Sequence, residues 1–181
     1  MLGIRFAHFD SMMHVIAYKN GKIKRQGRGL SFYYFAPTTS IVAVPVGSSG
    51  MPFIFSETTK DYQSVTIQGQ ITYRISKPAQ LADMLDFTVN HNGQWKCGDR
   101  DKLEQTIVNE AQTAAVAFMH CLGLKEAIRA AKQVEDMIHN GLQSSQTLEM
   151  LGVEILNVNV LAVKATPEMT RALETETREK L

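Results

Sequence analysis

Paired cysteines, long apolar runs and an excess of charge of one sign are all missing from this sequence. Its two cysteines, Cys97 and Cys121, are far apart and belong to no paired motif, which favours free thiols in a reducing compartment over a disulfide. The longest apolar runs, 41–46 and 114–119, are each six residues long, whereas a transmembrane helix needs about 20. The formal net charge is +1, so no global field attracts nucleic acid. We therefore expect no transmembrane segment and no nucleic-acid partner.

The amino terminus lacks the usual targeting signals. The segment MLGIRFAHFD has neither the charged start nor the apolar centre of a signal peptide. N-myristoylation requires glycine directly after the initiator Met, and Leu2 occupies that position. We expect a cytoplasmic protein, with any membrane contact peripheral and on the cytoplasmic face of the membrane.

Residue types that could carry catalysis or hold a metal ion are scattered along the chain. The five histidines include no pair at metal-binding spacing on one expected helix. His120 and Cys121 are adjacent at an expected helix end, but neighbouring helical positions point about 100° apart, which favours packing over a nucleophilic pair. The glycines lack the spacing of phosphate-binding loops. We expect no enzyme activity, no bound metal and no cofactor.

The first half of the chain reads mainly as strands. Asn20 and Gly21 separate two short extended segments and predict a hairpin with a type I′ turn, since both turn positions favour positive φ. The clearest pattern is at 61–76, where apolar and polar residues alternate as in an antiparallel sheet with one covered face. Further short strands are expected at 41–46 and 51–55, and glycines and Pro37 enclose a segment at 30–35 that holds four consecutive aromatic rings.

Apolar residues spaced by three and four predict helices in the second half. Asp101 and Glu104 resemble a capping box at the start of a long amphipathic helix that ends before Gly123. A third helix is expected over 134–152, with Gly141 as a weak point inside it. Two short helices are expected at 79–85 and 124–130.

The C-terminal stretch combines a strand with a polar helix. β-Branched residues favour a strand over 153–163, and its apolar parity shifts near the middle. Thr166 and Pro167 suit the N-cap and first position of the following helix. We expect an α+β domain over 1–165, mostly antiparallel sheet covered by helices. Residues 166–181 would be the start of a projecting helix, a candidate coiled coil, that a longer natural chain continues.

Four segments, taken together and in order, resemble a known domain. They are YKNGKIKRQGRGLSFYYFAP, DYQSVTIQGQITYRISKP, NEAQTAAVAFM and LEMLGVEILNVNVLAVKATPEMTRALE. The chain resembles the SPFH or prohibitin-homology domain of stomatins, prohibitins and flotillins over residues 12–181. This resemblance implies an α+β domain without known catalysis that lies at a membrane surface and oligomerises through the helix that follows it. Stomatin-like and prohibitin-like members usually carry an apolar membrane segment ahead of the domain, and this sequence shows no such segment. Flotillin-like and soluble bacterial-type members, which lack one, are therefore the closer analogy.

Two groups of residues are candidates for membrane contact. Five basic residues surround the first hairpin, where each would contribute about 1 kcal/mol near an anionic lipid surface. A solvated hairpin tip and a nucleic-acid contact are the other interpretations of this group. Four apolar residues near the amino terminus are candidates for shallow insertion into a bilayer, or alternatively for a core strand. The basic group is Lys19, Lys22, Lys24, Arg25 and Arg28, and the apolar group is Leu2, Ile4, Phe6 and Phe9.

The terminal helix carries the expectation of self-association. Its apolar residues Met169, Ala172 and Leu173 are candidates for contacts between copies of a longer chain, and a monomeric, frayed helix is the alternative for this fragment. The function expected from these features is a non-enzymatic scaffold that forms homo-oligomers and organises membrane patches or membrane-bound partners. The alternative is a soluble adaptor or regulatory subunit that binds another protein, such as a protease, without lipid contact.

Overall fold

The computed structural model describes residues 3–179, and these residues fall into two units, each of which is described separately. Unit 1 comprises residues 3–49, Tyr73–Thr106 and Gln146–Glu154. Unit 2 comprises Gly50–Thr72, Ile107–Ser145 and 155–179. Strands β7 (Ser64–Ile75) and β9 (Val153–Ala165) and helix α2 (Asp99–Met119) contribute residues to both units.

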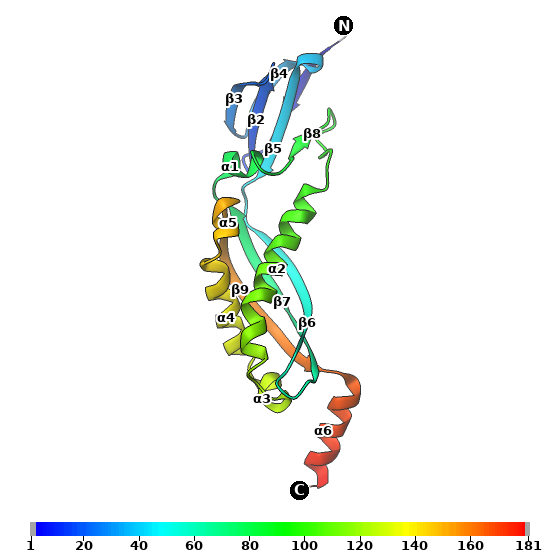
Figure 1. Cartoon of the computed structure of the whole chain (residues 1–181). Coiled ribbons are helices and arrows are strands. Elements are labelled where there is room, and N and C mark those ends of the chain that lie inside the picture. Colours follow the sequence, from blue (N-terminus) through cyan, green and yellow to red (C-terminus); the bar gives the residue numbers. More distant parts are fainter. Residues whose placement is uncertain (1–2, 180–181) are drawn as a thin grey trace. The chain divides into compact units, whose positions relative to one another are not determined.

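Strands precede most of the helices, and the α+β fold with a C-terminal helix is confirmed (Figure 1). The remaining strands are β1 (Ile4–His8), β2 (Met13–Lys19), β3 (Lys22–Arg28), β4 (Ser31–Phe35), β5 (Thr39–Pro45), β6 (Ser49–Thr58) and β8 (Thr88–Val89). The remaining helices are α1 (Pro78–Ala82), α3 (Leu124–Arg129), α4 (Ala131–Gln143), α5 (Gln146–Met150) and α6 (Pro167–Glu179), and a 3-10 turn, η1, spans Ala36–Thr38.

Unit 1 contains a two-stranded ribbon, β1–β4, and a four-stranded sheet in the order β3-β2-β5-β8. The predicted hairpin between β2 and β3 is confirmed, because Asn20 and Gly21 have φ values of 51° and 75°, as a type I′ turn requires. The sequence did not predict β8, since two residues carry no periodicity. The indole N–H of Trp95 donates to the Ala43 carbonyl at 2.9 Å and holds the segment after β8 against β5.

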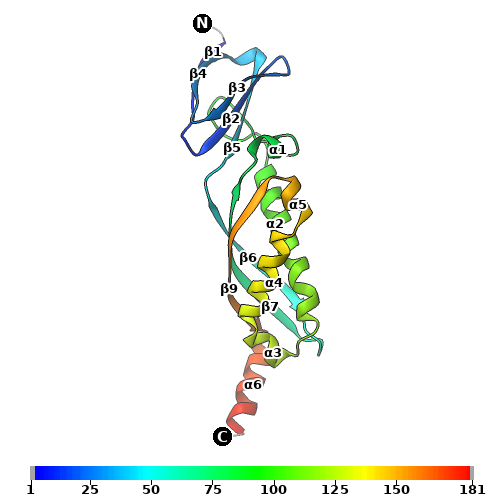
Figure 2. The ribbon, with the colours of Figure 1, turned by 90° about the vertical axis from the view of Figure 1, so that its left-hand side faces the viewer.

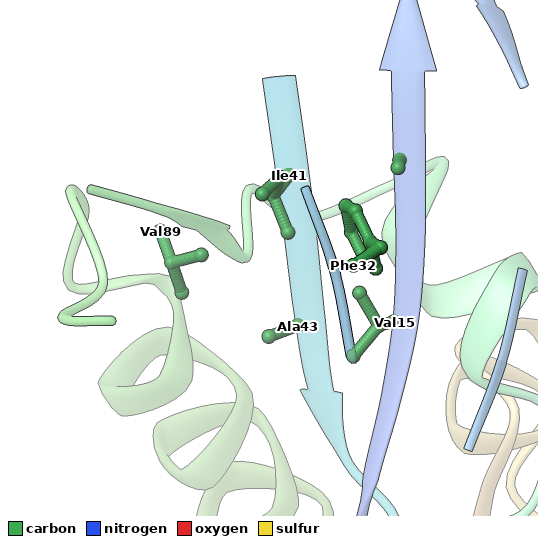
Figure 3. Packing of buried hydrophobic residues seen from close by; sticks show 6 residues of the cluster. Val15, Phe32, Ile41, Ala43 and Val89 are labelled. Atoms are coloured by element: carbon green, nitrogen blue, oxygen red, sulfur yellow. The ribbon is translucent and has the colours of Figure 1, made fainter. Parts of the chain in front are cut away.

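An apolar cluster fills the space between the strands of unit 1. Side chains from β2, β4, β5 and β8 converge on it (Figure 3). Phe32 lies in this cluster and is buried, although its neighbour Tyr33 is exposed. The buried members are Val15, Ala17, Phe32, Ile41, Ala43 and Val89.

Unit 2 is built on a three-stranded sheet in the order β6-β7-β9, and helices α2 and α4 lie along one of its faces (Figure 2). Alternate residues of β7 from Val65 to Ile75 are buried, so the predicted strand with one covered face is confirmed. Gly141 of α4 closely faces α2, because a Cβ atom at this position would lie 2.3 Å from the Cβ of Ala114. The glycine that looked like a weak point therefore allows the two helices to approach each other.

The expected start of the long helix was wrong by three residues, since a cap at Asp101 would place the first helical residue at 102. Helix α2 begins at Asp99 and not after a cap at Asp101. The Asp99 carboxylate accepts the backbone N–H of Asp86 at 2.9 Å and pairs with Lys102 at 2.6 Å. The Asp99 carboxylate therefore binds the loop before the helix. This contact is long-range, so the local capping pattern does not reveal it.

The single helix expected over 134–152 was also wrong, because the chain forms α4 and α5 in its place. Ser144 and Ser145 separate the two helices. The Ser144 hydroxyl donates to the Asn140 carbonyl at 2.9 Å, which satisfies a carbonyl at the C-terminus of α4. Serine competes with the helical backbone in this way, and the apolar stripe alone did not show the break.

Strand β9 and helix α6 follow the expected order. The buried positions of β9 change parity around Leu156 and Asn157, both of which are exposed, so the expected shift is confirmed. Helix α6 begins at Pro167 as predicted, buries none of its residues, and continues past the end of β9 (Figure 1). The Lys125 ammonium of α3 pairs with the Glu176 carboxylate at 2.6 Å. The domain boundary at 165/166 stays a prediction.

Candidate functional site

The exposed face of the β1–β4 ribbon is unusually apolar. The strand register places Ile4 opposite Phe35 and Phe6 opposite Tyr33, so these four side chains share one face. Their exposed fractions are 71% for Ile4, 42% for Phe35, 56% for Phe6 and 75% for Tyr33. The rings of Phe6 and Tyr33 are 4.9 Å apart between centroids. We call these four residues the apolar ribbon face, and a contiguous exposed surface of this kind is typical of a membrane or protein contact.

The other face of the ribbon anchors it to unit 1. Phe32 is buried in the apolar cluster, and Ala7 and Tyr34 pack against the same cluster. The ribbon is therefore held from one side and presents the four residues of its other side to solvent.

The structure divides the predicted N-terminal insertion group. Ile4 and Phe6 are exposed on the apolar ribbon face, whereas Phe9 is partly buried against the cluster, as a core residue would be. Leu2 lies outside the described residues. Tyr33 and Phe35 were not predicted for this face, which they reach because β4 pairs with β1. The run of four rings at 32–35 was the available signal.

A β-bulge interrupts β3 within the group of five basic residues at the hairpin. Arg25 lies opposite Ala17 and Ile23 lies opposite Tyr18, which leaves Lys24 without an opposite residue in β2. Consecutive side chains of a regular strand point to opposite faces. The bulge removes this constraint and allows Lys24 and Arg25 to line the same pocket.

This pocket has a volume of about 210 Å³ and lies between the β2–β3 hairpin and β4. We call it the basic–aromatic pocket. The guanidinium carbon of Arg25 lies 5.6 Å from the centre of the Phe32 ring. No carboxylate lines the pocket, and within residues 3–179 none of its three basic residues forms an ion pair. It is lined by Ala17, Lys19, Lys24, Arg25, Phe32, Tyr33, Tyr34, Phe35 and Thr39.

The two remaining basic residues of the group, Lys22 and Arg28, do not line this pocket. Arg28 lies opposite His14. Burial and, secondarily, the Arg28 charge lower the pKa of His14 below its usual value. His14 is therefore neutral at pH 7 and adds no charge to the hairpin.

A second, larger groove lies in unit 2 where α6 approaches α3. Its volume is about 920 Å³, and Ile128 of α3 and Leu173 of α6 contribute to its mainly apolar wall. Of the three predicted self-association residues, only Leu173 lines the groove. Met169 is partly buried and Ala172 is exposed.

A polar groove of about 850 Å³ lies in unit 1, and its lining includes Asp83, Asp86 and Asp99. The Cys97 thiol lies beside it and donates to the Asp86 carboxylate at 3.4 Å. This hydrogen bond and the negative charge of Asp86 raise the pKa of Cys97, so the thiol stays protonated and is a poor nucleophile at neutral pH. Among residues 3–179, no three His, Cys, Asp or Glu side chains are placed to hold a metal ion, and no helix is long and apolar enough to cross a membrane.

Comparison with known families gives a match to the SPFH domain / Band 7 family over residues 12–181. The matched range contains the hairpin, the basic–aromatic pocket and α6, but it begins after β1. A search of curated proteins gives no match. The Ile4 and Phe6 half of the apolar ribbon face therefore lies outside the range that the family describes.

Proposed function

The chain belongs to the SPFH domain / Band 7 family, and on that premise we propose that it is a non-enzymatic scaffold that lies on a membrane surface, forms homo-oligomers and organises membrane patches or membrane-bound partners. The family suggests a membrane-associated, scaffold-type role in general, and its members are generally non-enzymatic. The proposal adds the surface through which this chain would contact the bilayer.

The observation that supports this proposal best is the apolar ribbon face. Fully burying a Phe or Ile side chain is worth about 1.5–3 kcal/mol, so four partly exposed residues supply several kcal/mol on entering the headgroup boundary. Basic residues near an anionic surface add about 1 kcal/mol each. Peripheral binding that is stable usually combines two such signals, and unit 1 carries both.

Self-association is proposed to involve the face of α6 that carries Met169 and Ala172. These residues are three positions apart and therefore lie on one side of the helix. Leu173 already contributes to the groove beside Ile128, which makes it less available to another copy. In a longer chain, continuation of α6 would extend this face into a helix–helix contact.

The mainly apolar groove between α3 and α6 favours a second candidate function, a soluble adaptor that binds another protein without lipid contact. An apolar groove of this size is suited to a helix or an extended peptide. The scaffold would bind a lipid surface, whereas the adaptor would bind a protein segment in this groove.

Vesicle flotation separates the two functions. Residues 1–181 are mixed with phosphatidylcholine vesicles, with and without anionic lipid, and centrifuged through a density gradient. A membrane scaffold is expected to float with the anionic vesicles. If the chain remains at the bottom with both kinds of vesicle, the adaptor function replaces the scaffold.

A further inference from the structure

The geometry of unit 1 assigns a ligand to the basic–aromatic pocket. We propose that this pocket binds the phosphomonoester headgroup of a single membrane lipid. This inference rests on the proposed membrane association and goes further, because it replaces a diffuse attraction to negative surfaces with a built site for one chemical group.

The positive charge of the pocket favours a compact anion as its ligand. Lys19, Lys24 and Arg25 place three positive charges around one concavity that holds no carboxylate. Thr39, which lies opposite Lys19 in the sheet, adds a hydroxyl group to the wall. A phosphomonoester carries close to two negative charges near neutral pH and offers three acceptor oxygens, so it can accept charge-assisted hydrogen bonds from several of these groups together.

Two of the basic residues are positioned before any ligand arrives. The Arg25 guanidinium lies over the ring of Phe32, which is fixed in the buried cluster, and this contact limits the positions that the guanidinium can take. Lys24 owes its place to the β-bulge, a backbone feature that persists without ligand. A site whose donors are held in place loses less conformational entropy on binding.

The size of the pocket suits a small chemical group. Its volume of about 210 Å³ is below the range of about 300–1,000 Å³ that is usual for pockets holding drug-sized molecules. A phosphate group with its first attached carbons suits this space, whereas a complete nucleotide or a folded peptide does not.

The surroundings of the pocket favour a lipid over a soluble phosphate ester. Tyr33 and Phe35 belong both to the pocket wall and to the apolar ribbon face. A ligand that joins a phosphate directly to acyl chains matches this arrangement, with its headgroup in the pocket and its chains beside the exposed rings. A soluble phosphate ester would use only the charged half.

The test compares two lipids and two matched variants of the full 181-residue chain. Phosphatidylcholine vesicles carry either phosphatidic acid, a phosphomonoester, or phosphatidylserine at about twice its mole fraction, so that surface charge is equal. Lys19→Gln/Lys24→Gln removes two charges from the pocket. Lys22→Gln/Arg28→Gln removes two charges from the same hairpin outside the pocket. All four side chains are exposed, so both variants should fold.

The affinity ratio between the two lipids is the decisive readout. Wild type is expected to bind phosphatidic acid vesicles about tenfold more tightly than phosphatidylserine vesicles. The pocket variant should lose this ratio, and the control variant should keep it while binding both lipids more weakly. A wild-type ratio near one, or an equal loss of the ratio in both variants, overturns the proposal. If wild type binds both lipids equally, the pocket proposal fails and the proposed membrane function stands. If wild type binds neither lipid, both the pocket proposal and the membrane function fail.

A soluble probe distinguishes the source of the phosphate. Glycerol 3-phosphate is titrated into wild type without vesicles, followed by calorimetry. We expect binding that is at least about tenfold weaker than to phosphatidic acid vesicles, because the apolar ribbon face contributes nothing. Binding as tight as that to the vesicles would assign the pocket to a soluble phosphate ester and overturn the lipid source.

Discussion

The Arg25 guanidinium lies over the ring of Phe32, with 5.6 Å between the guanidinium carbon and the ring centre. Phe32 belongs to the buried cluster of unit 1, whereas Arg25 is exposed. The contact therefore joins the core of the unit to its charged surface. Through it, a core residue orients a cation that the hairpin alone would leave free to move.

Replacing Arg25 with Lys is expected to keep the charge and lose the planar guanidinium that lies over Phe32. The preference for phosphatidic acid over phosphatidylserine should fall by about two- to fivefold, which matches the energy of one exposed cation–π contact. Binding to phosphatidylserine vesicles should hardly change. Vesicle co-sedimentation measures both affinities, and an unaltered preference would show that the contact with Phe32 does not position Arg25 for the ligand.

Replacing Ile4 and Phe6 with Gln is expected to weaken binding to both kinds of anionic vesicle by about ten- to a hundredfold, because partial burial of two large apolar side chains is lost. The melting temperature should stay close to that of wild type, since both residues are exposed. The matched control is Ile54→Gln, which removes a residue of unit 2 that is 67% exposed. Equal losses in the two proteins would count against the apolar ribbon face.

Replacing Gly141 with Ala is expected to destabilise unit 2, because the new Cβ atom would lie 2.3 Å from that of Ala114. Overpacking should cost about 1–3 kcal/mol, more than the gain of about 1 kcal/mol in helix propensity. Urea unfolding measures the change. The double variant Ala114→Gly/Gly141→Ala removes the clash and should recover part of the loss, whereas a fully stable single variant would disprove the close helix approach.

Unit 2 is expected to lose stability in acid partly through Glu135. Its carboxylate pairs with Lys132 at 2.5 Å and accepts the backbone N–H of Val160 at 3.0 Å, and these contacts lower the pKa of Glu135 below its ordinary 4.5. A lowered pKa in the folded state stabilises the protein above about pH 4.5 and is lost as pH falls through the folded-state pKa. Glu135→Gln should therefore show a shallower decline of unfolding free energy below pH 4.5. An identical decline in both proteins would rule out this contribution.

Features that depend on neighbouring residues were predictable from the sequence. The turn at Asn20 and Gly21 needs only two residues that tolerate positive φ, and the alternation in β7 follows from one covered face. The strand at 153–163 and the helix starting at Pro167 were also found in this way.

The candidate site required contacts between distant residues, and the sequence pattern did not contain them. Ile4 meets Phe35 only because β1 pairs with β4 in one register. The bulge at Lys24 depends on how β3 pairs with β2. The sequence therefore showed that five basic residues lie near the hairpin, but not which of them line the pocket. The break between α4 and α5 at Ser144 and Ser145 was likewise not predicted, because the apolar positions continue across it at helical spacing.

The face of α6 that carries Met169 and Ala172 gives a further prediction. In a chain that extends α6, replacing both with Glu should reduce self-association by introducing like charges at the helix–helix contact. Light scattering at micromolar concentration measures the oligomer mass. Thr170→Glu adds a charge on another side of α6 and serves as the control. If the control dissociates the oligomer as fully as the double variant, this face is not the contact.

The depth of the apolar ribbon face in a bilayer tests the central claim most directly. An environment-sensitive fluorophore is attached to Ile4→Cys in a chain whose Cys97 and Cys121 are replaced by Ser, and a second protein carries the label at Ile54→Cys. With phosphatidic acid vesicles, emission from position 4 is predicted to shift to the blue and to be quenched by brominated acyl chains, while emission from position 54 stays unchanged. If position 4 responds no more than position 54, the ribbon does not enter the membrane and the account is contradicted.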